Sequence, residues 1–437
     1  MLRRKIEETL AEWKRTKGRQ GLLITGARQV GKTCSIEAFG EQHYENVLKI
    51  DFVEQPEAVA LITQASNVDD LVVRITSLST RPLPKGKTLL FFDEVQRCGD
   101  AITWMRYLSK DDRFDVVYSG SMLGIEAYDF RSLPVGTIDI AEMFPLDFQE
   151  FCWANGADDT LWAIIENCFA KQEAVPDFLH KKFADLFALY VLVGGMPDAV
   201  QTFIDTNDTQ AMRARQKSIL AAYRQDITRY VKDREHAQRI KTIFNAIPAQ
   251  LNKENRRFIV TGIDKKKRFD DMAPDFDWLE NAGVAIPVTR ATEATFPLGL
   301  SVERSYFKLY LCDVGLLFST FASADVQEIL LNADGINFGS AYENAVAQEL
   351  RAHGHANLTY FNTKGIGEVD FLVEDSRRPV VTPVEVKSGK YSRKHAALDK
   401  LLAVRNYSIE QALVLHRDNV AVDGRITYLP IYLAAFL

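Results

Sequence analysis

The stretch G-L-L-I-T-G-A-R-Q-V-G-K-T, residues 21–33, decides the fold of the first part of the chain. An apolar strand runs into a loop in which Gly26, Gly31, Lys32 and Thr33 match every fixed position of the phosphate-loop pattern G-x-x-x-x-G-K-[ST]. The glycines let backbone N–H groups close around phosphate oxygens, Lys32 supplies a positive charge, and the Thr33 hydroxyl can ligate magnesium. An ordinary strand-to-helix turn can match so short a pattern by chance, so the context has to decide.

A second stretch, T-L-L-F-F-D-E at residues 88–94, supports the phosphate-loop interpretation. It is typical of a buried parallel strand that ends in two carboxylates, which suits a magnesium-holding Asp93 and a water-polarising Glu94. A third apolar strand, 114–118, precedes Ser119-Gly120-Ser121. Such serines lie at the carboxyl edge of the sheet, where open α/β folds bind ligands. Ser121 is the predicted γ-phosphate sensor, and a serine-rich turn without a ligand is the alternative.

These motifs together predict a site for ATP and Mg²⁺. Lys32 and Glu94 are the predicted catalytic residues of this site, and Thr33 and Asp93 are the predicted metal ligands. The residues expected to contact the nucleotide are Gly26, Ala27, Arg28, Gln29, Val30, Gly31, Lys32, Thr33, Cys34, Asp93 and Ser121.

The composition is that of a folded globular protein. At 437 residues the chain is long enough for two to four domains, and its 47% hydrophobic and 26% charged residues argue against long disorder. No apolar run approaches the roughly 20 residues that span a bilayer, and the charged, amphipathic start is unlike a signal peptide. We therefore expect a cytoplasmic protein with no membrane partner. The five cysteines show no C-x-x-C spacing and predict neither a zinc nor a redox site.

The middle of the chain predicts helices followed by a two-stranded hairpin. Residues 152–235 are mainly helical, and helices near 237–251 and 270–282 precede strands at 284–290 and 305–311. This order makes a winged helix plausible. Because the net charge is −6, any DNA binding must come from local basic patches, and a solvated charge run is the alternative. The candidate phosphate contacts are Lys253, Arg256, Arg257, Lys265, Lys266, Lys267 and Arg268.

The last third carries a second group of chemically capable residues. Asp370 stands on one predicted strand, while Glu385 and Lys387, two residues apart, share one face of the next. Two carboxylates can hold Mg²⁺ against a scissile phosphate, Lys387 can orient the attacking water, and Glu343 can approach from a packed helix. Alternating charges on an exposed strand would look alike, but these lie between valines, where a charge pair without function is costly.

The chain resembles a family of prokaryotic AAA-type (AAA+) ATPases that carry a C-terminal domain of unknown function with a PD-(D/E)XK restriction-endonuclease-like core. The resemblance spans almost the whole chain. It rests on the motifs G-A-R-Q-V-G-K-T at 26–33, F-F-D-E-V-Q at 91–96, S-G-S at 119–121, F-P-L-D-F-Q-E-F at 144–151, G-G-M-P at 194–197, Y-R-Q-D-I at 223–227, F-K-L-Y-L-C-D-V-G-L-L at 307–317, and the tail motifs E-V-D-F and V-E-V-K-S-G.

The resemblance implies an α/β protein with four parts in a fixed order. These are a P-loop ATPase core with a parallel sheet at 1–151, a helical lid at 152–235, a winged helix at 236–311 and a restriction-endonuclease-like α/β domain at 312–437. Many relatives have an arginine finger after the glycine found here as Gly136, but this chain has Thr137 there. Arg131 is therefore the substitute candidate for reaching a neighbouring subunit's phosphate, and a solvated surface arginine is the alternative. A structure with a bound nucleotide analogue would show whether Arg131 or Arg113 enters a neighbour's site.

The leading hypothesis is an ATP-hydrolysing protein that couples nucleotide state to a DNA-facing winged helix and a metal-dependent nuclease-like domain. Under this hypothesis Asp370 and Glu385 are metal ligands, and Lys387 and Glu343 complete the catalytic set. The alternative is an ATP-dependent regulatory or protein-interaction module whose nuclease-like domain is inactive. The expected partners are ATP, DNA through the basic run, and a second copy of the chain or another protein.

Overall fold

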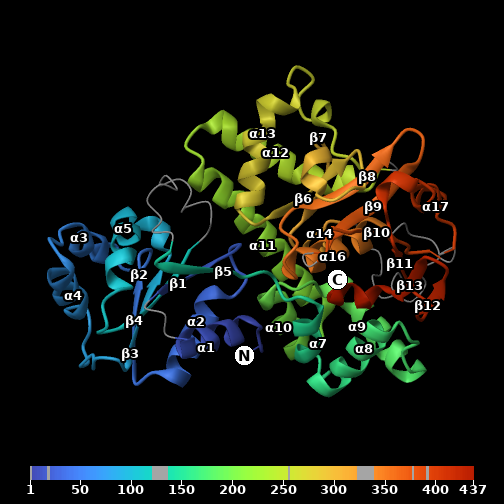
Figure 1. The fold of residues 1–437 in the computed structure, drawn as a ribbon. Coiled ribbons are helices and arrows are strands. Elements are labelled where there is room, and N and C mark those ends of the chain that lie inside the picture. Colours follow the sequence, from blue (N-terminus) through green and yellow to red (C-terminus); the bar gives the residue numbers. More distant parts are fainter. Residues whose placement is uncertain are drawn as a thin grey trace. The chain divides into compact units, whose positions relative to one another are not determined.

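The computed structural model describes residues 2–16, 20–120, 136–253, 256–321, 339–375, 378–389 and 393–437. The chain divides into two compact units (Figure 1). The N-terminal unit comprises Met1–Phe144 together with Asn281–Gly283, and the C-terminal unit comprises Pro145–Glu280 and Val284–Leu437.

The N-terminal unit is built on a five-stranded, fully parallel sheet with the order β2-β3-β4-β1-β5. The apolar runs of the sequence form the central strands, as predicted, because strands covered on both faces need apolar residues at nearly every position. The strands are β1 (Gly21–Thr25), β2 (Asn46–Asp51), β3 (Thr88–Asp93), β4 (Asp115–Ser119) and β5 (Ile138–Glu142).

Helices cover both faces of this sheet (Figure 1). Alternate residues of β1 divide between the two faces, since Leu22 and Ile24 pack with α1 and α2, whereas Leu23 packs in the cluster that holds α3, α4 and α5. The result is a three-layered α/β unit whose strand ends, rather than faces, are open to a ligand. The helices are α1 (Ile6–Thr16), α2 (Lys32–His43), α3 (Pro56–Thr63), α4 (Val68–Thr76), α5 (Gly99–Leu108) and the 3₁₀ turn η1 (Val95–Arg97).

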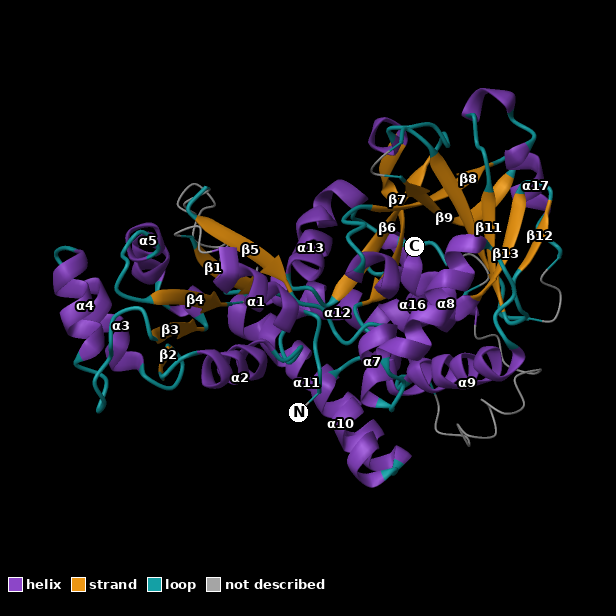
Figure 2. Cartoon of the chain, turned by 60° about the horizontal axis from the view of Figure 1, so that its bottom comes forward, coloured by secondary structure: helices purple, strands orange, loops and turns teal. Residues whose placement is uncertain are grey.

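The first half of the C-terminal unit is helical, as the sequence predicts. Figure 2 shows these helices in purple. Across the described ranges no single helix is both long and apolar enough to cross a membrane; by length and composition alone, only the bent pair α9 and α10 could. The helices are α7 (Phe148–Ala154), α8 (Asp159–Lys171), α9 (Asp177–Val193), α10 (Pro197–Thr206), α11 (Thr209–Tyr230), α12 (Arg234–Leu251) and α13 (Phe269–Asn281), with η3 (Val260–Gly262) before α13.

The second half of this unit carries a mixed eight-stranded sheet with the order β12-β13-β11-β10-β9-β8-β6-β7 (Figure 2). Its strands are β6 (Ala285–Ala291), β7 (Val302–Leu311), β8 (Leu358–Thr363), β9 (Gly367–Glu374), β10 (Val381–Val386), β11 (Ala412–His416), β12 (Ala421–Asp423) and β13 (Ile426–Pro430). The helical elements among them are α14 (Val314–Phe318), α16 (Gly339–Ala352), α17 (Ala396–Leu402), η4 (Leu298–Ser301), η5 (Arg405–Tyr407) and η6 (Ile431–Phe436).

The β6–β7 hairpin, expected from the sequence as the wing of a winged helix, belongs to this large sheet. β6 pairs in parallel with β8, with Val288 opposite Leu358, and antiparallel with β7. The parts that the sequence analysis separates at residue 311 therefore share one set of backbone hydrogen bonds. This pairing joins strands that are far apart in the sequence, and it brings β7 side chains to the residues of β9 and α16.

The G-G-M-P motif forms a tightly packed corner between α9 and α10. Gly194 ends α9 with a φ of 73°, and Asp313 Oδ2 accepts a hydrogen bond from the backbone N–H of Gly195 at 2.5 Å. A Cβ atom on Gly194 would lie 2.3 Å from Asp313 Oδ1, and one on Gly195 would lie 2.0 Å from the carbonyl oxygen of Leu146. Close approach of other parts of this unit therefore requires glycine at both positions, where α9 ends and α10 begins.

Candidate functional site

The phosphate loop has the geometry that its glycines predict. Gly26 and Gly31 have φ values of 136° and 99°, in the region that L side chains rarely adopt. A Cβ on Gly26 would meet the carbonyl oxygen of Met143 at 2.1 Å, so glycine is needed here for packing as well as for the turn. Helix α2 begins at Lys32, which places its N-terminal N–H groups at the end of the loop.

Lys32 is buried and turned toward its own loop. Its Nζ donates to the carbonyl oxygens of Gly26 at 3.0 Å and Ala27 at 2.8 Å. Burial lowers the pKa of Lys32 to about 8, against the opposing effect of Glu94 and Asp93. A triphosphate would replace neutral carbonyls with anionic oxygens, which favour the charged ammonium. Around it, Val30 is buried, whereas Arg28, Gln29 and Cys34 are exposed.

Thr33 and Asp93 lie together, as the metal prediction requires. The Thr33 hydroxyl donates to Asp93 Oδ2 at 2.8 Å, and the Ser119 hydroxyl donates to Asp93 Oδ1. A hydroxyl beside a carboxylate is a donor set that fits Mg²⁺, which prefers hard oxygen ligands. Lys49 on β2 adds a cation, with its Nζ 3.7 Å from Asp93 Oδ2 and 2.9 Å from Glu37 Oε1.

Glu94 is held in a strained and directed position. It has a φ of 55° and a ψ of 44°, a left-handed conformation that costs energy for a residue other than glycine and is found most often at functional sites. Gln96 Nε2 donates to Glu94 Oε2 at 2.6 Å and fixes one carboxylate oxygen. Polarising a water, the role predicted for Glu94, would fall to its other carboxylate oxygen.

Sequence reasoning missed Gln96 and Lys49, and it placed Ser119 at the sheet edge without its contact to Asp93. Gln96, Ser119 and Lys49 each contact one of the predicted carboxylates. In the sequence, Lys49 looks like an ordinary polar position on an alternating strand. Ser121 and Arg131 lie outside the described residues. Arg113 pairs with Asp111 at 2.5 Å and Asp69 at 2.9 Å, so this finger candidate is engaged within its own unit.

The C-terminal candidates converge on one buried polar cluster. The backbone N–H of Val386 donates to Asp370 Oδ2 at 2.9 Å, which joins β10 to β9. Lys387 Nζ lies 2.6 Å from Glu385 Oε1. Burial, reinforced by the nearby Asp370, raises the pKa of Glu385 to about 7, even though Lys387 opposes the shift. The four residues predicted from the sequence therefore do share a region.

A residue that was not predicted, Lys308, occupies the middle of this cluster. Its Nζ lies 2.7 Å from Glu368 Oε1, 3.3 Å from Asp370 Oδ1 and 3.4 Å from Glu343 Oε2. Tyr310 also donates to Glu343 Oε2, at 2.7 Å. Within the described ranges, no group of three or more His, Cys, Asp or Glu side chains is arranged to hold a metal ion. As they lie, these donors are engaged with protein cations and do not fit Mg²⁺.

The seven basic residues between 253 and 268 that were predicted to contact phosphates form two sets with different surroundings. Arg256 forms an ion pair with Glu343, and the Arg257 guanidinium lies 3.6 Å from the centre of the Tyr306 ring. Lys253 Nζ donates to Gln250 Oε1 at 3.0 Å. The remaining residues, Lys265, Lys266, Lys267 and Arg268, have partly or fully exposed side chains. Lys253 is exposed as well, whereas Arg256 and Arg257 are partly buried.

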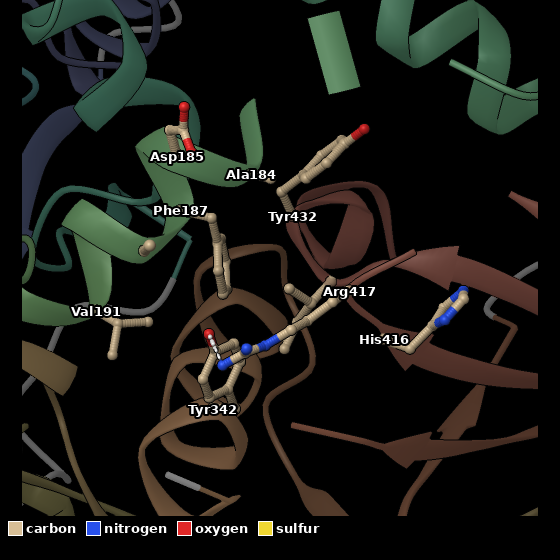
Figure 3. A pocket seen from close by; sticks show the side chains of 10 residues that line it. Ala184, Asp185, Phe187, Val191, Tyr342, His416, Arg417 and Tyr432 are labelled. Atoms are coloured by element: carbon tan, nitrogen blue, oxygen red, sulfur yellow. Dashed lines mark hydrogen bonds between the residues drawn. The ribbon is translucent and has the colours of Figure 1, made fainter. Parts of the chain in front are cut away.

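A separate small cavity of about 170 Å³ lies between α9 and the C-terminal strands (Figure 3). Arg417 points toward Tyr342 and donates to its hydroxyl at 3.4 Å, and Phe187 and Val191 supply apolar walls. The cavity holds none of the predicted site residues.

Three family models match the chain. Residues 18–152 match an AAA domain, residues 184–325 match a domain of unknown function (DUF8612), and residues 338–434 match a second domain of unknown function (DUF4143). The first match identifies residues 18–152 as an AAA domain, which is the class of domain predicted for this part of the chain. The other two models assign no activity.

Solved structures with partial similarity include ATP-dependent and DNA-associated proteins. A Walker-type ATPase from Pyrococcus abyssi is 14% identical with a TM-score of 0.45, and the match covers 73% of this chain and 95% of that one. The Orc1 protein of Aeropyrum pernix, in complex with DNA, is 11% identical with a TM-score of 0.31, and the match covers 76% of this chain and 93% of that one. The Holliday junction branch migration motor RuvB of Thermotoga maritima is 14% identical with a TM-score of 0.29, and the match covers 65% of this chain and 89% of that one. These values establish no shared function. A comparison with curated proteins found no match.

Proposed function

We propose that the protein binds ATP with Mg²⁺ and hydrolyses it at the carboxyl edge of the N-terminal sheet. The observation that carries this proposal is the meeting of Thr33, Asp93 and the oriented Glu94 beside the phosphate loop. Thr33 and Asp93 would hold Mg²⁺, which neutralises charge on the transferring phosphoryl group. Lys32 binds the phosphates, and Glu94 orients and polarises the attacking water.

Two substitutions test this assignment. Lys32→Ala should weaken ATP binding about 10- to 100-fold, since a buried charge-assisted contact is lost. Glu94→Gln should retain ATP and slow turnover by about 10²- to 10⁴-fold, because only the proton-accepting group is removed. Glu41→Gln, at an exposed glutamate near the end of α2, is the matched control. Phosphate release and nucleotide-binding assays separate the two effects, and wild-type hydrolysis by both site variants would refute the proposal.

We further propose that the exposed basic set at 265–268 gives the C-terminal unit a DNA-facing surface. Phosphate contacts release counterions, so four of them predict a slope of about −3.6 for log affinity against log salt, at about −0.9 per contact. Reversing Lys265, Lys266 and Lys267 to Glu should abolish binding, while Lys217→Glu, an exposed lysine of α11, should not. Binding without salt dependence, or equal losses in both variants, would leave 265–268 as a solvated surface.

For the endonuclease-like part we favour the regulatory alternative, in which nucleotide state controls binding rather than cleavage. The observation that favours it is the neutralisation of Glu343, Asp370 and Glu385 by Arg256, Lys308 and Lys387. Catalytic carboxylates would need free oxygens for a metal ion. A plasmid-cleavage assay with Mg²⁺ or Mn²⁺ tests this choice. DNA cleavage by the wild type that is lost in Asp370→Ala and Lys387→Ala would refute the regulatory alternative and support the metal-dependent nuclease hypothesis.

A further inference from the structure

Lys308 lies among three carboxylates that could otherwise serve a divalent cation as ligands. Its side chain is fully buried, and its Nζ lies within 3.4 Å of oxygens from Glu343, Glu368 and Asp370. Mg²⁺ binds its oxygen ligands at about 2.0–2.1 Å. An ion that bound the same oxygens would therefore overlap the ammonium group, and the two cannot be present together.

The other oxygens of the two central carboxylates are also engaged. Asp370 Oδ2 accepts the backbone N–H of Val386, and Glu343 Oε1 pairs with Arg256. Glu385 Oε1 pairs with Lys387, and among the described residues Glu385 Oε2 has no hydrogen-bond partner. Each of Asp370 and Glu343 thus has a protein partner on both oxygens, and the one oxygen of Glu385 without a partner cannot by itself hold Mg²⁺ tightly.

Lys308 cannot easily leave this position. It stands within β7, where it lies opposite Val288 in the antiparallel pairing with β6. Removing its ammonium from the cluster would require either a shift of that strand or the burial of unpaired carboxylates, which is strongly unfavourable. The Tyr360 ring, 5.3 Å from Nζ, further favours the cation there.

We propose that Lys308 is the resident cation of this cluster and takes the place that a metal ion would hold. The cluster is then a metal-independent ionic core that joins β7, β9 and α16. This inference rests on the proposed regulatory role of the C-terminal unit. It adds that the cation bound by the carboxylates is Lys308.

Calorimetric titration with Mn²⁺ tests the inference on the full chain without nucleotide. Wild type and Asp370→Asn should bind Mn²⁺ equally, because Asp370 contributes to no metal site. The charge-balanced variant Lys308→Met with Glu368→Gln should gain one Mn²⁺ site at least tenfold tighter than any in the wild type. Adding Asp370→Asn to that variant should remove the gained site. Thermal unfolding with and without Mn²⁺ checks the fold of every variant.

The results of these titrations distinguish a failure of the Lys308 inference from a failure of the regulatory function. A wild-type Mn²⁺ site that is lost in Asp370→Asn would overturn the inference, as would a folded paired variant that gains no site. A paired variant that unfolds alone and folds with Mn²⁺ supports it, whereas one that stays unfolded with Mn²⁺ counts against it. Metal-independent DNA cleavage by the wild type would refute the regulatory function, while Lys308 would remain the resident cation of the cluster. Mn²⁺ binding through Asp370 without DNA cleavage would refute Lys308 as the resident cation and leave the regulatory function standing.

Discussion

ATP binding should draw a proton onto Lys32 in mildly alkaline solution. The pKa of the buried ammonium is lowered to about 8, and the bound triphosphate would raise it again. At pH 8.5 a group with this pKa is protonated in roughly a quarter of molecules, so binding should take up about 0.75 proton. At pH 7 about nine-tenths are already protonated, and the uptake falls to about 0.1. ATP affinity should accordingly decrease as the pH rises above about 8.

The proton uptake can be measured by calorimetry of MgATP binding in two buffers that differ in ionisation enthalpy, at pH 7.0 and 8.5. The matched control is Lys32→Arg, whose guanidinium stays charged at both pH values, so its binding should take up no proton. Equal uptake in the wild type at both pH values, or equal uptake in the arginine variant at pH 8.5, would show that Lys32 is not the titrating group. The burial argument would then be wrong.

Two further substitutions probe positions that the structure singles out. Gln96→Leu should lower kcat about tenfold with little change in ATP affinity, because Glu94 loses the hydrogen bond that directs it; a change in affinity alone would contradict this role. Gly194→Ala should destabilise the fold by about 1–3 kcal/mol or more in chemical unfolding, since its Cβ would strike the Asp313 carboxylate at a positive φ. The control Gly156→Ala has a φ of 78° and open space around its Cβ, and equal losses in the two variants would mean that backbone strain alone matters.

The N-terminal unit was largely predictable because its signals are local. Apolar runs specified β1, β3 and β4 to within a residue or two, and the phosphate loop lies within one short stretch. β12 was missed because its three residues, 421–423, contain no apolar run and remain partly exposed. Gln96 was missed because nothing in its position two residues after Glu94 indicates that its side chain would turn back to that carboxylate.

The C-terminal cluster shows where sequence reasoning stops. Alternation predicts strand positions for Asp370 and Glu385, which lie on β9 and β10. Lys387 was expected on the same strand as Glu385, but β10 ends one residue before it, at Val386. Lys308 lies 35 residues from Glu343 and 62 from Asp370, and in F-K-L-Y it looks like an ordinary outward-facing residue of a strand. The parallel pairing of β6 with β8 puts β7 into the sheet that holds β9, and no local pattern in the sequence predicts that pairing.

The corner at Gly194 bears on how this chain could be divided. Leu146 donates its N–H to the Gly195 carbonyl, Asp313 caps the same turn, and Gln348 of α16 accepts the N–H of Val314. A fragment that began at residue 152 would lose Leu146, and one that began at 312 would lack the glycine corner. A fragment that starts at Pro145 keeps every one of these contacts, so it is the piece to express when the C-terminal unit is wanted by itself.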